Sequence, residues 1–194
     1  MAIKPDDVKE SDESLMVRVR EGDHKAFASL VNRHSRMFYA AAFRMCGHQQ
    51  EAEDIVQEAF IKLWKNPHSW DPENGAKFST WFYRVVTNQA LDHLRKRKPQ
   101  AEVPETLSDG APDALDQLEA GSMQADLERA IQSLPERQKA ALNLCFYEGL
   151  SNKDAADILG VGVKALESLL MRAKTALRDE MARMGYEVKD KRYG

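Results

Sequence analysis

The sequence has little of what several classes of protein depend on. Its two cysteines, Cys46 and Cys145, stand alone and form no CxxC pair, so we expect neither a disulfide framework nor a zinc site. We interpret both as small core residues in a reducing cytoplasm, although a redox role stays open. No run of eighteen apolar residues occurs, so no membrane span is expected, and the polar N-terminus is unlike a secretory signal.

The sequence also lacks the marks of a catalytic centre. It has no glycine loop that would cradle a phosphate, no metal-ligand spacing of His, Cys and Asp, and no plausible catalytic triad. Its five histidines are scattered. We therefore expect that the protein is not an enzyme and that it uses no cofactor, no metal and no small-molecule substrate.

Charge is distributed unevenly along the chain. The net charge of −3 conceals a basic stretch from residue 14 to residue 98 and a stretch from 99 to 121 that has six acids and no base. We expect a disordered acidic arm (1–13), a basic module (14–98), an acidic linker (99–121), a second module (122–185) and a tail (186–194). Binding to nucleic acid follows the local patch, so the slightly acidic total does not exclude it.

Apolar residues recur at helical spacing on both sides of the linker, which predicts an all-α protein with two small helical domains. Ser14 could cap the first helix, and the second is expected to end near Gly47. The clearest periodicity runs from Gln49 to Trp64. On the side opposite its core face lie Asp54, Gln57, Glu58 and Ile61.

This polar stripe has two interpretations. The acids could simply complement the helix dipole, with one isolated apolar residue at the surface. Alternatively, an exposed isoleucine beside acids and an amide could form a docking stripe for another protein.

The stretch from Lys77 to Lys98 has six cationic side chains, one acid and four aromatics. Wound as a helix at about 100° per residue, it places Phe82, Val85, Val86, Ala90 and Leu94 on a core face. A second stripe holds Arg84, Asn88, Asp92 and Arg95. Such a stripe suits phosphates and base edges, but an ordinary amphipathic helix with a basic end would show the same pattern.

The C-terminal module predicts a helix-turn-helix motif. Ser151 caps a short helix through Leu159, and the turn Gly160-Val161-Gly162 leads to a long helix from Val163 to Met184. Core-facing positions on this helix are Leu166, Leu170, Ala173 and Leu177. The residues facing away, toward a DNA major groove, are Lys164, Ser168, Met171, Arg172 and Thr175. The same motif also occurs as simple helix packing.

Assembled in order, these segments resemble the extracytoplasmic-function (ECF, group IV) RNA polymerase sigma factors of the sigma-70 family. The segments are EAEDIVQEAFIKLWKN (51–66), FSTWFYRVVTNQALDHLRKRK (78–98), SLPERQKAALNLCFYEGLSNKDAADILGV (133–161) and VKALESLLMRAKTALR (163–178). The resemblance implies a sigma-2 helical bundle and a sigma-4 helix-turn-helix domain, joined by the flexible acidic linker. It also implies a cytoplasmic protein whose partners are core RNA polymerase, promoter DNA and an anti-sigma factor.

The resemblance also implies roles for individual residues. Asp54, Gln57 and Glu58, with Ile61 beside them, would dock on the β′ clamp helices of the polymerase, and the C-terminal domain would contact the β flap. Asn88 would capture a flipped base of the −10 element. The remaining −10 contacts would be Arg84, Asp92, Arg95, Lys96 and Arg97.

The −35 element would be read by Lys164, Glu167, Ser168, Met171, Arg172 and Thr175. Here the sequence departs from the family, because Glu167 and Leu169 stand where basic residues are common. Glu167 could accept a hydrogen bond from a cytosine or could face away from DNA.

The implied function is promoter-specific initiation of transcription, in a stress or envelope response under anti-sigma control. Two alternatives are a free-standing helix-turn-helix regulator and a sigma mimic that sequesters an anti-sigma factor. Such regulators usually dimerise on palindromes, and a mimic has no need of the basic patch from Arg84 to Lys98.

Overall fold

The computed structural model describes residues 10–72, 75, 77–96 and 116–186, with side chains from residue 123 onward in the last range. Within these ranges the chain forms helices and no strand, which confirms the predicted all-α fold. None of the helices described is both long and apolar enough to cross a membrane. The start of the predicted arm, most of the acidic linker, Arg97 and most of the tail lie outside the described residues.

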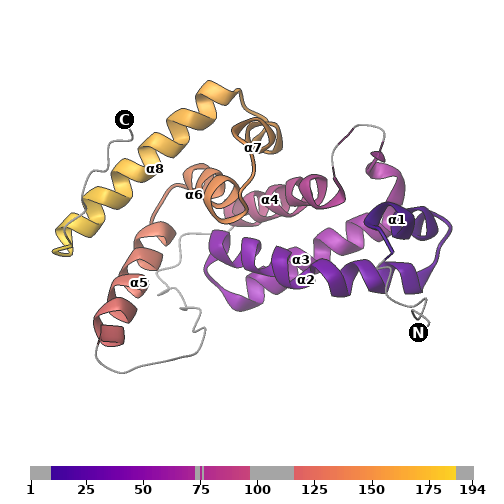
Figure 1. Ribbon diagram of the computed structural model, residues 1–194, viewed down its shortest axis with the longest axis horizontal. Coiled ribbons are helices and arrows are strands. Elements are labelled where there is room, and N and C mark those ends of the chain that lie inside the picture. The colour runs from indigo at the N-terminus through magenta and orange to yellow at the C-terminus, as the bar shows by residue number, and fades with distance from the viewer. Residues whose placement is uncertain (1–9, 73–74, 76, 97–115, 187–194) are drawn as a thin grey trace, which may run out of the picture.

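The helices form two groups, drawn in indigo to magenta and in orange to yellow in Figure 1. The N-terminal half contains α1 (Asp12–Arg20), α2 (His24–Cys46), α3 (Gln49–Lys65), the 3-10 helix η1 (Pro67–Ser69) and α4 (Phe78–Lys96). The C-terminal half contains α5 (Asp116–Gln132), α6 (Glu136–Leu142), the π-helix η3 (Asn143–Tyr147), α7 (Asn152–Leu159) and α8 (Val163–Arg183).

Polar caps and a left-handed glycine set several helix ends. Asp23 precedes α2 and accepts two backbone N–H groups of its first turn, at 2.8 and 3.2 Å. Ser151 caps α7, as predicted, by accepting the N–H of Asp154 at 3.1 Å. Gly47 ends α2 with a φ of 75°, a conformation that a residue with a Cβ adopts only with strain.

The first helix begins earlier than the sequence predicts. Ser11, not Ser14, is its N-cap, and the Ser11 hydroxyl accepts the backbone N–H of Ser14 at 3.2 Å. Asp12 therefore lies in the first turn, where its carboxylate contacts Arg33 at 2.6 Å and His34 at 2.8 Å. These partners are on α2, and local sequence patterns could not reveal them.

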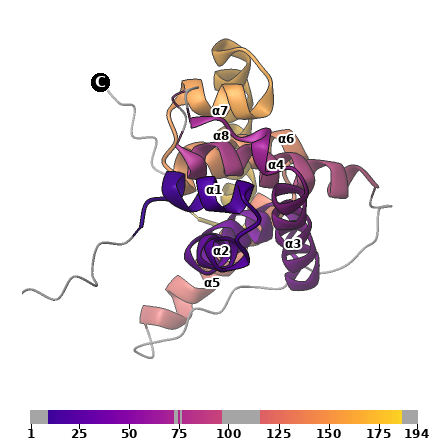
Figure 2. The ribbon, with the colours of Figure 1, turned by 90° about the vertical axis from the view of Figure 1, so that its right-hand side faces the viewer.

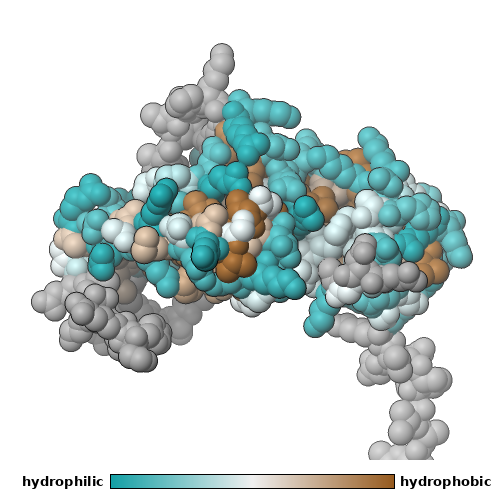
Figure 3. All heavy atoms as spheres, turned by 90° about the horizontal axis from the view of Figure 1, so that it is seen from above, coloured by the Kyte–Doolittle hydropathy of each residue, from teal (hydrophilic) through white to brown (hydrophobic). Residues whose placement is uncertain are grey.

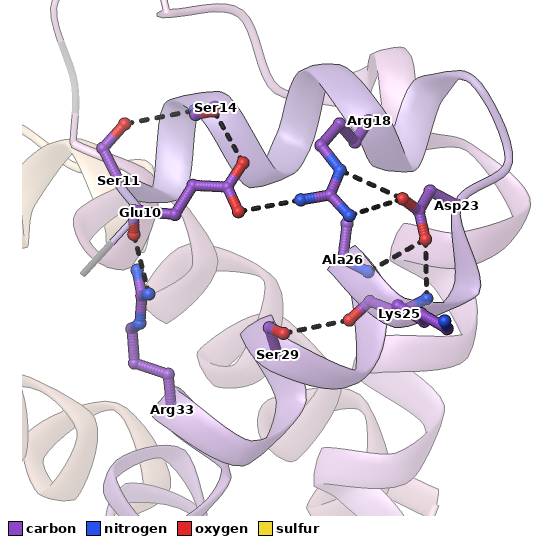
Figure 4. Close-up of polar contacts among 9 residues, drawn as sticks. All are labelled: Glu10, Ser11, Ser14, Arg18, Asp23, Lys25, Ala26, Ser29 and Arg33. Carbon is purple, nitrogen blue, oxygen red and sulfur yellow. Dashed lines mark hydrogen bonds and ion pairs between the residues drawn. The ribbon is translucent and has the colours of Figure 1, made fainter. Parts of the chain in front are cut away.

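Figure 4 shows how this first segment is attached to α1 and α2. The Glu10 carboxylate accepts from Arg18 at 2.8 Å, and its backbone carbonyl accepts from Arg33 at 2.7 Å. Arg18 also donates two hydrogen bonds to Asp23, at 2.7 and 3.0 Å. The prediction of disorder up to residue 13 is therefore wrong from Glu10 onward, because these acidic side chains have basic partners.

An aromatic cluster forms the core of the N-terminal half. Phe38 of α2 has no exposed surface, and its ring lies 4.7 Å from Phe82, 5.0 Å from Tyr83 and 6.3 Å from Phe60. Burying aromatic side chains of this size contributes strongly to stability. The cluster joins α2, α3 and α4 and so fixes the outward faces of α3 and α4.

The helix α5 begins at Asp116, within the range predicted for the acidic linker and before Ser122, where the second module was expected to start. Further along, Ile131 packs in a cluster with Ala173 of α8.

The two halves pack against each other, with α4 in contact with both α6 and α7. Figures 1 and 2 both show α4 between the N-terminal bundle and these helices. The buried residues of α4 form the expected core stripe, which begins at Phe78, and a second stripe one residue further along: Phe82, Val86 and Ala90, then Tyr83, Thr87 and Leu91. Because Tyr83 contacts Glu148, the second stripe faces the C-terminal half.

Candidate functional site

The four residues singled out on α3 lie together on its outer side. Asp54, Gln57, Glu58 and Ile61 are all exposed, and Ile61 shows 49% of its surface. The face opposite them is buried as the periodicity predicts, through Ala52, Ile55, Val56, Ala59, Phe60 and Leu63. We call these four exposed residues the α3 stripe.

A groove of 380 Å³ between α2 and α3 borders this stripe. Its walls are mostly apolar and include Phe27, Phe60 and Trp64, while Gln57 and Ile61 belong to both the groove and the stripe. A partner helix that lies along the stripe can therefore place an apolar side chain in the groove while its polar side chains meet the acids.

The predicted DNA-binding residues of α4 are also exposed. Arg84, Asn88, Asp92, Arg95 and Lys96 all lie at the surface. The one ion pair among them joins Asp92 to Arg95 at 3.5 Å, with both side chains more than half exposed. Such an exposed pair is weak, so it leaves the cation available to a phosphate.

The aromatic residues of α4 are occupied in the core. Phe78, Phe82 and Tyr83 are no more than 5% exposed, and Trp81 is half-buried against Phe78 and Phe82, with ring centroids at 6.0 and 5.8 Å. Trp81 is thus the most accessible of the four. Tyr83 has a different role, because its hydroxyl donates to Glu148.

The helix-turn-helix motif is formed by α7 and α8, and Gly160 at the turn has a φ of 63°. Ala155 and Ala156 of α7 are buried where the helices pack, which lets the helices approach closely. On α8 the predicted core residues Leu166, Leu170 and Ala173 are buried and Leu177 is partly buried. Figure 3 shows the outer face of this region as mainly hydrophilic, with a few hydrophobic side chains between the polar ones.

All six predicted −35 residues on α8 are exposed: Lys164, Glu167, Ser168, Met171, Arg172 and Thr175. Met171 shows 64% of its surface, and the Ser168 hydroxyl donates to the Lys164 carbonyl at 3.0 Å. At about 100° per residue, Glu167 lies at the border of the outer face, roughly 60° from the mean direction of Lys164, Met171 and Thr175. The acid is therefore at the flank of the helix rather than at its outermost point.

In the part of the chain that the structure describes, no group of three His, Cys, Asp or Glu side chains is placed to hold a metal ion. Burial raises the pKa of the Cys46 thiol to about 11, so this thiol is neutral and unreactive at physiological pH. Both cysteines are free thiols.

Comparison with known proteins places the chain in a family. The model of sigma-70 region 2 matches residues 30–100, and that of sigma-70 region 4 matches residues 124–177. The ECF RNA polymerase sigma factor SigW of Bacillus subtilis is 34% identical over 179 residues, covering 84% of this chain and 93% of that protein. The chain belongs to the ECF family of RNA polymerase sigma factors. It is an alternative sigma factor, a factor of transcription initiation.

Other relatives agree with this assignment. The ECF sigma factor SigE of Mycolicibacterium smegmatis is 33% identical over 192 residues, covering 93% of this sigma factor and 73% of that protein. Two solved structures have a similar fold. CnrH, in complex with the cytosolic domain of CnrY, gives a TM-score of 0.65 at 23% identity, covering 90% of this chain and 99% of that chain. RpoE of Bartonella quintana, in complex with the anti-sigma factor NepR, gives a TM-score of 0.64 at 21% identity, covering 81% of this chain and 98% of that chain.

Sequence reasoning missed a set of polar residues between the halves of this sigma factor. Arg44 and Tyr83 of the N-terminal half each contact Glu148 of the C-terminal half. Lys139 of α6 and Asn143 of η3 are buried polar residues. Tyr83, an aromatic residue outside the predicted core stripe of its helix, is a local signal that could have indicated such an interface.

Proposed function

We propose that the α3 stripe is the surface on which this sigma factor docks onto the clamp helices of the polymerase β′ subunit. The observation that supports this proposal is the grouping of Asp54, Gln57, Glu58 and Ile61 on one exposed side beside an apolar groove. Carboxylates suit a basic partner helix, and the groove suits one of its apolar side chains.

We further propose that the exposed stripe of α4 binds the opened −10 element. Asn88 would capture an extruded base, since its amide can both donate and accept hydrogen bonds. Extruding a base costs a few kcal/mol, which a shaped polar site recovers. Arg84, Arg95 and Lys96, together with Arg97 outside the described residues, would hold phosphates, and Asp92 would keep Arg95 oriented.

The outer face of α8 is proposed to read the −35 element in the major groove. Arg172 can bind a guanine through two hydrogen bonds, and Met171 can contact a thymine methyl group. Lys164 and Thr175 would contact phosphates, with Ser168 facing the bases. Glu167, at the flank, would accept from a cytosine only if the helix tilts toward that side.

The remaining proposals concern organisation and control. Residues 14–98 would act as the unit for polymerase docking and −10 recognition, and residues 122–185 as the unit for −35 recognition and contact with the β flap. The protein would work in the cytoplasm without catalytic activity of its own. The solved relatives CnrH and RpoE are bound to CnrY and NepR, so we propose an anti-sigma factor as a partner of this chain in a stress or envelope response.

Measuring affinity for core polymerase tests the docking proposal most directly. Replacing Asp54 and Glu58 together by Ala should weaken binding about tenfold or more and reduce its dependence on salt, because two charges no longer contribute. The matched control replaces Glu13 and Glu21, two exposed acids at the ends of α1, by Ala, which removes the same charge outside the α3 stripe. Unchanged affinity of the α3 variant would remove the docking proposal.

A further inference from the structure

The outer side of α3 changes from acidic to basic toward its C-terminal end. Asp54 and Glu58 lie on this side in the middle of the helix, and Lys62 and Lys65 lie on it in the last turn, all four exposed. At about 100° per residue, the four side chains fall within roughly 80° of one another. Cations in a last turn also favour the helix dipole, so the function of the two lysines depends on what lies beside them.

The two lysines lie beside α4. Lys62 donates to the side-chain oxygen of Gln89 of α4, and near the other end of α3 the Glu51 carboxylate lies 3.6 Å from His93 Nε2 of α4. The later α3 residue thus meets the earlier α4 residue, so the two helices run in opposite directions. Lys65, about one turn beyond Lys62, therefore lies toward the N-terminal end of α4.

The lysines border one side of the exposed surface of α4, and Arg84 lies on the other side. At about 100° per residue, Asn88 lies roughly 40° from Arg84 around the helix axis, Trp81 roughly 60° and Gln89 roughly 140° in the same direction. Gln89 marks the border with α3, since it contacts Lys62. Asn88 and the half-buried Trp81 therefore lie between Arg84 and the lysines of α3.

The chemistry of this surface suits a single strand of DNA. The charge of Lys62 is not neutralised by its hydrogen bond, because the Gln89 side chain is a neutral amide. An ammonium group binds a phosphate as a point charge and does not read a base edge through a fixed pair of donors. An extruded nucleotide has a phosphate on each side, and cations on both sides of Asn88 and Trp81 can hold both. Proteins that bind single strands combine such a positively charged track with exposed aromatic side chains.

We propose that Lys62 and Lys65 bind backbone phosphates of the opened non-template strand at the −10 element, on the side of Asn88 away from Arg84. This inference rests on the proposed −10 function of α4 and adds a second helix to that surface. The hydrogen bond to Gln89 holds the ammonium group of Lys62 beside the strand. The acidic middle of α3 then faces the polymerase, and its basic last turn faces DNA.

Binding of the holoenzyme to an already opened −10 element tests the proposal. The probe is a short DNA duplex from a promoter that the wild-type holoenzyme transcribes, with mismatched base pairs across the −10 element and no −35 element. Core polymerase is saturated with the sigma factor. Replacing Lys62 and Lys65 together by Ala should weaken binding roughly threefold to tenfold, by a similar factor for probes of different sequence. The slope of log affinity against log salt concentration should shrink by about 1.4, since each phosphate contact on a single strand contributes about 0.7.

Three variants separate the charge of the lysines from other effects. Lys62→Arg combined with Lys65→Arg keeps both charges and should retain the affinity and the salt slope of the wild type. Lys174→Ala combined with Arg178→Ala removes the same charge from exposed positions of α8 and should leave binding to this probe unchanged. Gln89→Ala removes the partner of Lys62 and keeps the cation, so its salt slope should equal that of the wild type.

Neutral backbone linkages locate the contact. Methylphosphonate linkages, which carry no charge, replace the phosphates of the non-template strand one at a time. At the positions that the lysines contact, a neutral linkage should weaken binding by the wild type and have little further effect on the double alanine variant. Equal weakening of both proteins at every position would overturn the proposal. Unchanged affinity and slope of the double alanine variant, or an equal loss in the α8 variant, would overturn it as well.

The outcome for the proposed function is separate. A wild-type holoenzyme that binds the opened probe no more tightly than core polymerase alone would refute the −10 function of α4, and the inference would fall with it. If Asn88→Ala and Arg84→Ala weaken binding while the double alanine variant equals the wild type, the −10 function stands and only the role of the lysines is refuted.

Discussion

Gln89 of α4 donates its side-chain N–H to the carboxylate of Glu58 on α3 and accepts from Lys62 through its side-chain oxygen. The proposed docking stripe and the proposed −10 helix are thus joined by hydrogen bonds between neighbouring side chains. Asn88 is the residue next to Gln89 in the chain, so the orientation of Glu58 is coupled to the helix that carries the proposed base-capturing residue.

Replacing Gln89 by Ala should weaken binding to core polymerase modestly. The bond is exposed to solvent, and such bonds contribute about 0.5–1 kcal/mol, which corresponds to a two- to fivefold change in affinity. The control is Gln49→Ala, because Gln49 makes a similar bond to Glu53 within α3, at 3.2 Å. An equal effect of both changes, in a direct titration of core enzyme, would argue against a specific role for Gln89.

Asn88→Ala should impair the opening of promoter DNA more than the formation of the closed complex. The side chain is exposed and supports no core contact, so its loss should leave the fold intact and remove hydrogen bonds to a base only after melting. Permanganate reactivity of unpaired thymines reports opening, and a gel-shift assay reports the closed complex. An equal loss in both assays would refute the base-capture role.

Arg172→Ala should reduce affinity at one position of the −35 element. A bidentate contact with guanine contributes about 1–3 kcal/mol of discrimination. The variant should therefore bind the wild-type promoter and a promoter changed at that one base pair with similar affinity. A matched set of promoters, each changed at one base pair, supplies the measurement. Uniform weakening across the set would identify Arg172 as a phosphate contact.

Much of the fold follows from periodicity within single helices. The core face of α3 and the separation of Leu166, Leu170 and Ala173 from the polar side of α8 are confirmed by burial, because each helix buries one stripe whatever its partner. The residues Ser11, Tyr83 and Glu148 were not predicted. The roles of Tyr83 and Glu148 depend on partners in other helices, 65 positions apart for this pair, which local patterns do not encode. Ser11 caps its own helix by accepting the N–H of Ser14.

The candidate surfaces could be predicted for the same reason. A stripe of polar residues opposite a core face is necessarily exposed, as found for Asp54 on α3 and Asn88 on α4. What periodicity could not indicate is that α4 buries a second stripe against the C-terminal half. A sequence that predicts two modules on a linker does not specify whether those modules touch.

The N-terminal segment should respond to acid through Arg18. A hydrogen bond from Ser14, with further contributions from Arg18, lowers the pKa of Glu10, and hydrogen bonding by Arg18 lowers the pKa of Asp23. A carboxyl group whose pKa is lower in the folded state stabilises that state at pH values above its usual pKa of about 4. This stabilisation is lost as the pH falls through the folded-state pKa. Arg18→Met should therefore be slightly less stable than wild type at pH 7, with the difference disappearing toward pH 2.

Urea denaturation across that pH range supplies the measurement, and the effect should be small because both carboxylates are solvent-screened. The control is Arg178→Met on α8. Arg178 lies 3.9 Å from Asp179, and both side chains are exposed. If the free energy of unfolding differs between wild type and Arg18→Met by the same amount at pH 7 and at pH 2, the electrostatic account is contradicted.

Transcription in vitro tests the central claim most directly. Core RNA polymerase is incubated with genomic fragments that include the DNA upstream of this protein's own operon, with and without the purified protein. We predict discrete transcripts that appear only when the protein is present, and co-elution of the protein with core enzyme. Failure to co-elute, together with the absence of any transcript that depends on the protein, would contradict the account.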